Sequence, residues 1–164
     1  MTVEVQVEKI TCVELRRATP EDRDALIEMY RSFEPKGAAL GLPPWKDTEK
    51  WLDGLARYLN FVVFADGRLA GHGALCRAGA TAEVAVFVHQ DFRRRGLGQR
   101  LLAAMIREAR RLGLRRVWGT AEMDNYSALA MVRLLGFVRG KHPNEYYFDL
   151  KKSNPVETEL VSCT

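Results

Sequence analysis

The stretch from Ala82 to Leu102, AEVAVFVHQDFRRRGLGQRLL, decides the fold of this chain. It begins with a run of β-branched residues typical of a strand and passes through a polar break to three arginines and a Gly-Leu-Gly. An amphipathic helix follows, because apolar residues recur at helical spacing from Leu101 to Leu112 while charged residues occupy the opposite face. The first amides of a helix lack partners within the helix and lie at the positive end of its dipole, so they attract phosphate oxygens. The stretch therefore predicts a strand that leads into an anion-binding helix N-terminus.

Two familiar phosphate motifs do not fit this stretch. A Rossmann turn requires a third glycine that this chain lacks, and the phosphate loop of nucleoside triphosphatases requires a Gly-Lys pair followed by Ser or Thr. What remains is Arg93-x-x-Gly96-x-Gly98 after a strand, where the glycines let a ligand approach the backbone closely. The alternative is that Arg93, Arg94 and Arg95 form a solvated charge run. The position of the triplet between a strand and a Gly-x-Gly helix start favours phosphate binding.

Composition and length indicate one ordinary globular domain. The chain has 164 residues, of which 47% are hydrophobic and 28% charged. No apolar run approaches the roughly 18 residues of a membrane helix, and the N-terminus lacks an apolar signal core, so we expect a cytoplasmic protein without membrane contact. The three histidines are far apart, and we expect no metal. The net charge of +4 keeps nucleic-acid binding through the arginine-rich helix open as an alternative, although no nucleic-acid-binding motif accompanies it.

Periodicity and turn residues predict the order of the elements. The expected strands are Val13 to Arg17, Phe61 to Ala65, Arg68 to Arg77, Ala82 to Val88, Arg115 to Thr120 and Tyr146 to Leu150. The expected helices begin at the Thr19 cap, run from Asp47 to Leu59, follow Gly98, and run from Asn125 to Leu135. Asp66-Gly67 predicts a hairpin turn. The Pro- and Gly-rich segment from Glu34 to Lys46 is an apolar loop, either a lid on the core or an acceptor-binding loop.

The Arg-x-x-Gly-x-Gly pattern in this setting resembles the acyl-CoA-binding motif of the GCN5-related N-acetyltransferase (GNAT) superfamily. A second segment, Asn125-x-x-Ala128 followed by Leu-Leu-Gly-Phe, resembles the GNAT segment in which an Asn contacts the cofactor. The resemblance implies an α+β fold with layered helices, in which about four helices flank a mixed, mostly antiparallel sheet of six to seven strands. It covers an N-acetyltransferase domain at 13–150, which leaves an N-terminal leader or edge strand at 1–12 and a C-terminal tail at 151–164.

The resemblance also implies a site for acetyl-CoA as co-substrate. GNAT enzymes lay pantetheine along the fourth strand and bind the thioester oxygen with a backbone amide, which acts as a small oxyanion hole. The residues implied to bind the cofactor are Val86, Phe87, Val88, Arg93, Arg94, Arg95, Gly96, Leu97, Gly98, Gln99 and Asn125. An Asn near a helix start is also a common N-cap, so Asn125 has a structural alternative.

Glu83 is the candidate general base. A lysine of pKa about 10.4 is neutral only about once in 2,500 molecules at pH 7, so an acceptor amine needs help to lose its proton. Strand alternation places Glu83 on one face with Ala85 and Phe87, and apolar neighbours are expected to raise the pKa of its carboxyl. The alternative is an exposed glutamate at a strand start. Many GNAT enzymes carry a Tyr as general acid where this chain has Val132.

Val132, in place of that tyrosine, narrows the resemblance to one group of GNAT enzymes. The tyrosine-free helix ALAMVRLLGF, together with an acid in the fourth strand, resembles the catalytic domain of Pat-type protein lysine acetyltransferases. We therefore expect acetyl transfer to a primary amine, first of all a protein lysine, by direct attack on the thioester. The alternatives are a small-molecule amine as acceptor and a non-catalytic CoA-binding or regulatory module. The enzyme would act as a monomer or homodimer.

Overall fold

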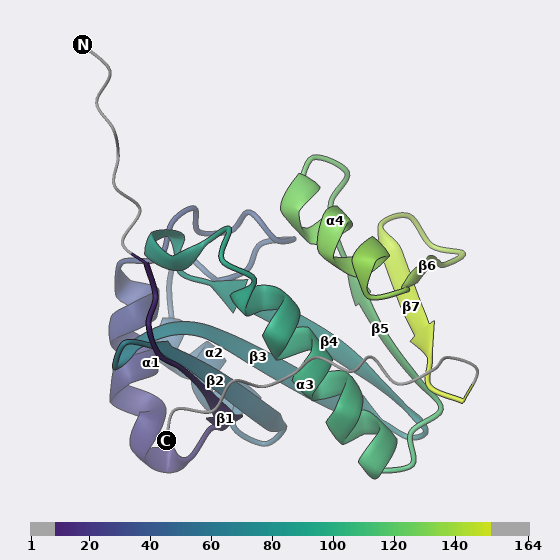
Figure 1. The fold of residues 1–164 in the computed structure, drawn as a ribbon, viewed down its shortest axis with the longest axis horizontal. Coiled ribbons are helices and arrows are strands. Elements are labelled where there is room, and N and C mark those ends of the chain that lie inside the picture. Colours follow the sequence, from purple (N-terminus) through teal and green to yellow (C-terminus); the bar gives the residue numbers. More distant parts are fainter. Residues whose placement is uncertain (1–8, 152–164) are drawn as a thin grey trace.

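A seven-stranded sheet with the order β1-β2-β3-β4-β5-β7-β6 forms the centre of the molecule (Figure 1). The structure is a computed structural model that describes residues 9–151, so most of the expected leader and tail lies outside the described residues. The strands are β1 (Val13–Arg17), β2 (Leu59–Ala65), β3 (Arg68–Ala78), β4 (Thr81–Val88), β5 (Arg116–Thr120), β6 (Val138–Arg139) and β7 (Glu145–Asp149). The α-helices are α1 (Arg23–Arg31), α2 (Thr48–Leu55), α3 (Leu97–Arg111) and α4 (Tyr126–Leu134), and two 3-10 turns are η1 (Pro20–Asp22) and η2 (Gln90–Phe92).

Every neighbouring pair of strands is antiparallel except β4 and β5, which are parallel. Sheet and helices confirm the expected mixed, mostly antiparallel α+β fold. No helix within residues 9–151 is long and apolar enough to cross a bilayer.

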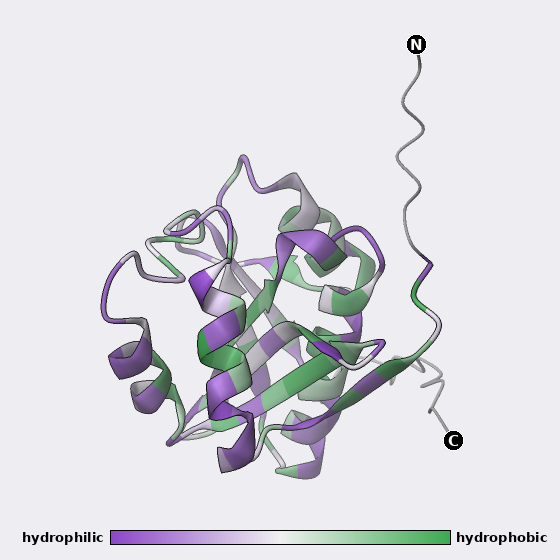
Figure 2. Ribbon diagram, turned by 90° about the vertical axis from the view of Figure 1, so that its left-hand side faces the viewer, coloured by the Kyte–Doolittle hydropathy of each residue, from purple (hydrophilic) through white to green (hydrophobic). Residues whose placement is uncertain are grey.

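The helices form two layers, one on each face of the sheet. α3 and α4 pack on one face with the larger apolar cluster, while α1 and α2 pack on the other with a smaller, aromatic cluster (Figure 1). β4 serves both layers, because Val84 and Val86 face α3 while Ala85 and Phe87 face α1 and α2. Apolar residues lie in the sheet and on the inner helix faces, and polar residues lie on the outer faces (Figure 2). The expected alternation along this strand is confirmed.

The hairpin predicted at Asp66-Gly67 is present. Both residues have positive φ, 48° and 81°, as a two-residue turn between twisted strands requires. The Asp66 carboxylate also accepts hydrogen bonds from the backbone N–H of Thr11 and of Cys12, at 3.2 and 2.8 Å. These bonds fix the segment before β1, in which residues 9–12 form no strand.

The first helix begins later than the Thr19 cap indicates. Pro20–Asp22 is a 3-10 turn, and α1 begins at Arg23. The Asp22 carboxylate accepts the Thr19 N–H at 2.8 Å and pairs with both terminal nitrogens of Arg16 at 2.7 and 2.9 Å. The hydrogen bonds from Arg16 are the main reason why the pKa of Asp22 is lowered to about 2. An ion pair with β1 therefore holds this turn.

The second helix ends at Leu55 rather than at Leu59, which belongs to β2. The cause is Asn60, whose side-chain nitrogen donates to the carbonyls of Leu55 and Tyr58 at 2.8 and 3.0 Å. The Asn60 side chain thus caps the C-terminus of α2 although it belongs to the following strand. Hydrophobic periodicity does not reveal a cap of this kind. The two-residue β6 was not expected either, because a strand this short carries no pattern.

A buried polar chain joins α1 to β3 and β2. Because the Asn60 nitrogen is used in two donor bonds, its oxygen accepts from His72 Nε2 at 2.8 Å. His72 Nδ1 then accepts from the Tyr30 hydroxyl at 2.7 Å, so the imidazole is neutral with its hydrogen on Nε2. Burial lowers the pKa of His72 to about 4. Every side chain in this hydrogen-bond network has a partner, and the network fixes α1 against the sheet.

The buried imidazole makes stability depend on pH. Between pH 6.5 and about 4, His72 is protonated in the unfolded chain but stays neutral in the folded chain. The free energy of unfolding therefore decreases as the pH falls through this window. We expect this histidine to contribute up to about 3 kcal/mol of the loss. Chemical unfolding at pH 7, 5.5 and 4 should show a shallower pH dependence in His72→Gln than in the wild type.

The matched control is Tyr30→Phe, which removes one hydrogen bond but leaves the imidazole buried. This variant should be less stable at every pH and keep most of the wild-type slope. Equal slopes for wild type and His72→Gln would contradict the assignment.

Candidate active site

β4 and β5 are paired only at their beginnings. Thr81, Ala82 and Glu83 are aligned with Arg116 to Trp118, and beyond them the two strands diverge (Figure 1). The second half of β4 thus keeps β3 on one side and has no strand on the other.

The backbone of β4 presents alternate residues to this open side. The N–H of His89 donates to Ala70 on the β3 side, and the N–H of Arg115 donates to Ala80 on the β5 side. Because backbone groups alternate along a strand, those of Val86 and Val88 point away from β3, toward the opening. Phe87 points its backbone toward β3, so only its side chain can take part in a site here. Among the described residues, the N–H and carbonyl of Val86 therefore have no strand partner and face the opening.

The N-terminus of α3 faces the same opening. Gly96 has a φ of 77°, which favours glycine, and its carbonyl accepts the first helical bond from Arg100 at 3.1 Å. The amides of Leu97, Gly98 and Gln99 consequently have no acceptor inside the helix. A side chain at Gly98 would meet Met131 Sδ at 3.3 Å and a Val88 methyl at 3.4 Å, so glycine keeps this approach open.

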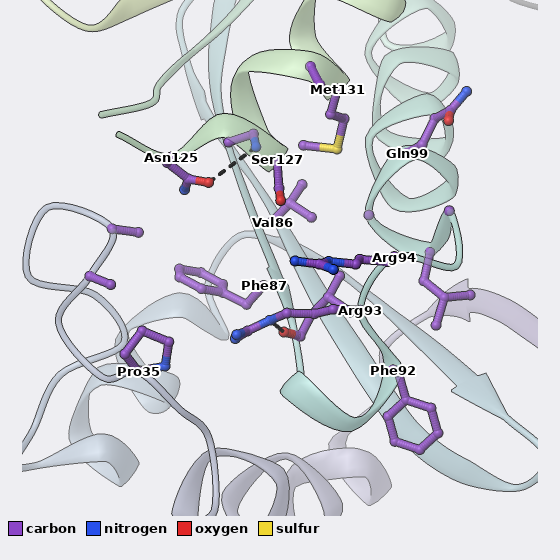
Figure 3. A pocket seen from close by; sticks show the side chains of 18 of the residues that line it. Pro35, Val86, Phe87, Phe92, Arg93, Arg94, Gln99, Asn125, Ser127 and Met131 are labelled. Carbon is purple, nitrogen blue, oxygen red and sulfur yellow. Dashed lines mark hydrogen bonds between the residues drawn. The ribbon is translucent and has the colours of Figure 1, made fainter. Parts of the chain in front are cut away.

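A cavity of about 610 Å³ occupies the space between these elements (Figure 3). Its walls come from β4, the start of α3, the start of α4, and the loop between α1 and α2. Of the expected cofactor-binding residues, the cavity is lined by Val86, Phe87, Val88, Arg93, Arg94, Gly96, Leu97, Gly98, Gln99 and Asn125. One expected residue, Arg95, does not line it.

The three consecutive arginines take three different positions. Arg93 donates to the carbonyls of Val88 and Glu34 at 2.9 and 2.6 Å, and burial lowers its pKa. Arg94 has a φ of 63°, and its side chain extends into the cavity beside that of Arg93 (Figure 3). Arg95 instead lies near Asp66, whose pKa its charge helps to lower. Only Arg94 thus offers a guanidinium without a protein partner among the described residues of the cavity.

α4 contributes side chains that the sequence pattern did not single out. Ser127 and Met131 line the cavity together with Val86 (Figure 3). Asn125 accepts the Ala128 N–H at 3.2 Å and so caps α4, while it also lines the cavity. The Gln99 side chain points away from the two arginines (Figure 3). Small polar residues at helical positions carry no sequence signal, which is why Ser127 was missed.

The loop between α1 and α2 forms the remaining wall. Pro35, Ala38 and Leu42 line the cavity, and Leu40 N–H donates to Glu122 before α4 at 3.2 Å. The segment expected to be either a lid or an acceptor-binding loop thus closes one side of the candidate site.

Glu83 lies outside the cavity, on the face of the sheet opposite to α3. It is aligned with Cys76 of β3 and Trp118 of β5. Its side chain is exposed, as the alternative interpretation of this glutamate expects, although the burial it does have raises the pKa of its carboxyl. The same carboxylate adds to the burial that raises the pKa of Cys76 to about 11, so this thiol is not a reactive nucleophile.

Val132 packs into the core and is only 9% exposed. The position at which many GNAT enzymes carry a tyrosine is therefore filled by apolar contacts. Tyr126, at the start of α4, is 78% exposed and does not line the cavity, so it does not take the place of that tyrosine there. Within residues 9–151, no three His, Cys, Asp or Glu side chains are grouped as metal ligands.

Comparison with known proteins agrees with this geometry. Residues 23–137 match the model of the acetyltransferase (GNAT) family. The chain is 33% identical over 107 residues to the ribosomal protein bS18-alanine N-acetyltransferase of Salmonella typhimurium, covering 63% of this chain and 71% of that protein. The protein of the same name from Escherichia coli K12 is 30% identical over the same shares.

Solved structures share the fold. An acetyltransferase from Salmonella typhimurium, solved with its cofactor acetyl-CoA, has a TM-score of 0.70 at 24% identity and covers 88% of this chain and 98% of its own. The ribosomal-protein-S18-alanine N-acetyltransferase of Escherichia coli has a TM-score of 0.69 at 21% identity, covering 90% and 99%. These structures show the fold, and the match to the family model over residues 23–137, together with the 33% identical relative, shows that this chain belongs to the GNAT family of acetyltransferases, enzymes that take acetyl-CoA as co-substrate.

Proposed function

We propose that this enzyme transfers the acetyl group of acetyl-CoA to a primary amine on a protein, by direct attack on the thioester with Glu83 as general base. The divergence of β4 from β5 after Glu83 carries the proposal, because it leaves the N–H of Val86 free at the cavity wall. A thioester carbonyl that accepts a hydrogen bond from the Val86 N–H would lie at the edge of β4. An amine could then approach it from the sheet face that carries Glu83.

The cofactor would extend along two elements. Its pyrophosphate suits the free amides of Leu97 to Gln99 and the guanidinium of Arg94, which offer directed N–H donors and positive charge at a helix N-terminus. Its pantetheine suits the unpaired edge of β4, which would gain the hydrogen bonds of an added strand. The Val86 N–H would then stabilise the oxyanion that develops on the thioester carbonyl.

Glu83 would act from the opposite face through a water molecule. It lies three residues before Val86, about 10 Å along the strand, which suits a relayed rather than a direct proton transfer. Its raised pKa improves the carboxylate as a base. A thiolate of pKa near 8.5 leaves without much assistance, so burial of Val132 is compatible with turnover.

The acceptor we propose first is the α-amine of a protein N-terminus. The curated relatives are named for acting on an alanine of a ribosomal protein, and the α-amine is the only amine that alanine can carry. An α-amine of pKa about 7.8 is neutral in about one molecule in seven at pH 7, far more often than a lysine. A site whose candidate base is exposed therefore favours the α-amine.

A protein lysine is the second candidate. The strand-borne acid at Glu83 and the helix with Val132 in place of tyrosine support it by resemblance to Pat-type enzymes. A small-molecule amine and a non-catalytic role are the remaining alternatives, and the experiments below separate them.

Gly98→Asp should abolish acetyl-CoA binding. The new side chain would enter the space between Met131 and Val88, and its charge would repel phosphate. An acid in the first turn stabilises a helix, so the fold should persist. Calorimetric titration should show a Kd for acetyl-CoA raised at least about 100-fold, or about 2.7 kcal/mol.

Gly98→Ala is the control, because it adds a methyl without charge and should weaken binding far less. If acetyl-CoA raises the Tm of Gly98→Asp as much as that of the wild type, the cofactor does not bind at this helix.

Glu83→Gln should lower kcat at neutral pH about 100-fold, because the amide cannot accept the proton of the amine. The wild-type rate should decline toward acid as the carboxyl becomes protonated, at a pH above the usual range of a glutamate. That acidic limb should disappear in the variant, while the Kd for acetyl-CoA stays the same. Thiol release from acetyl-CoA measures the rate.

Asp124→Asn tests the competing carboxylate, since Asp124 lines the cavity. It should keep the wild-type pH profile. A variant at Glu83 that retains full activity across pH would refute the base assignment.

Peptides decide the acceptor. A peptide with a free N-terminal alanine and no lysine should be acetylated with higher kcat/KM than its N-terminally blocked counterpart with one lysine. Mass spectrometry of the products locates the acetyl group. Exclusive modification of the lysine peptide would reverse the order of the two candidates, and thiol release with free amines alone would favour the small-molecule alternative.

A further inference from the structure

A second cavity, of about 530 Å³, lies at the turn between β6 and β7, apart from the cofactor cavity. It is lined by Arg116, Arg139, Gly140, Lys141, His142, Glu145 and Tyr147. We propose that this basic cavity binds a carboxylate side chain of the acceptor protein, and so selects acceptors with an acidic residue close to the acetylated amine. The proposal rests on the proposed function and names its substrate class.

The charges of the cavity favour an anion. Arg139 and Lys141 are exposed and have no acidic partner within residues 9–151, whereas Arg116 pairs with Asp149 at 2.7 Å and stacks on Tyr147 at 4.0 Å. The Arg116 pair fixes one wall, and the other two cations remain available.

The position of the cavity connects it to the reaction. Glu83 is aligned with Trp118, and Trp118 with Tyr147, so the three side chains form a row on one face of three adjacent strands. The residues that precede Glu83 and Trp118 in their strands, Ala82 and Val117, belong to the apolar cluster under α3 and α4. Because side chains alternate along a strand, the row therefore faces away from α3 and α4. Two strand spacings separate Glu83 from Tyr147 by about 10 Å.

This spacing sets the length of the acceptor segment. An extended peptide advances about 3.3 Å per residue, so an amine at Glu83 places its third or fourth residue at the basic cavity. For an N-terminal acceptor, the acidic residue should therefore stand at position 3 or 4 of the acceptor protein.

The cavity favours a single carboxylate over a nucleic acid. Glu145 contributes its own negative charge, and its carboxylate lies against Gly140, where an added Cβ would meet it at 2.6 Å. A polyanion with closely spaced phosphates would be repelled by this group, whereas one side-chain carboxylate can contact Lys141 and Arg139 instead.

Direct binding tests the cavity without turnover. A fluorescent, N-terminally blocked peptide with Glu at positions 3 and 4, titrated with the CoA-saturated enzyme at low salt, should bind about fivefold more weakly to Arg139→Ala/Lys141→Ala than to the wild type. The control Lys50→Ala/Arg133→Ala removes two exposed cations that line neither cavity, and it should bind like the wild type. Equal Kd values for all three proteins would overturn the proposal, as would tighter binding of single-stranded DNA that displaces the peptide.

Kinetics test the selection. Peptides with a free N-terminus and Glu at positions 3 and 4 should have about a fivefold lower KM than peptides with Ala there, at equal kcat, and the double variant at 139 and 141 should lose that difference. Acetylation without any preference for Glu would overturn the selection and leave the proposed function intact. Binding of the acidic peptide without acetylation of any amine would instead contradict the proposed function.

Discussion

The short parallel pairing between β4 and β5 is the constraint on which the site depends. A strand paired along its whole length presents no free donors, whereas β4 loses its second neighbour after Glu83. Gly119 stands at the point of divergence, where a Cβ would lie 3.1 Å from the Val84 carbonyl, so a side chain there would push the two backbones slightly apart. Unpaired backbone groups in a partly buried wall are costly. A ligand that pairs with them would recover that cost, which is the physical reason for proposing the unpaired edge as the binding surface.

The half of β4 that lacks β5 is held from the side of α1 instead. Arg93 binds the Val88 carbonyl, and His89 bonds to Ser32 through Nε2 at 2.9 Å. Gln90 donates to the Ser32 carbonyl and accepts from the Glu34 N–H, at 2.6 and 2.9 Å. These contacts replace strand pairing with side-chain bonds that leave the cavity side open. They also explain why the guanidinium of Arg93, in a motif expected to bind phosphate, donates to protein carbonyls instead.

The sequence predicted those parts of the fold that depend on local pattern. Val13–Arg17 and the turn at Asp66-Gly67 follow from alternation and turn chemistry, and both are confirmed. The end of α2 was wrong because Asn60, five residues beyond Leu55 in the chain, caps the helix from a strand. Likewise, the placement of Ser127 in the cavity wall depends on how α4 packs against the sheet, and Arg95 turns toward Asp66 instead of the cavity. The Arg-x-x-Gly-x-Gly motif could be recognised in the sequence. Which of its arginine side chains enters the cavity depends on the tertiary structure.

The packing of α4 leaves no room for a tyrosine at position 132, where many GNAT enzymes carry their general acid. Val132 lies in the apolar cluster with Leu135 and Phe137, so a tyrosine at this position would have to displace core contacts rather than simply extend into the cavity. The leaving thiolate must then depart on its own basicity, which a thiol of pKa near 8.5 permits. The difficult step would then be the supply of a neutral amine, and the proposed base, Glu83, would act on that step alone. Such a site works best on an amine that is already partly neutral, and this argues for an α-amine before a lysine.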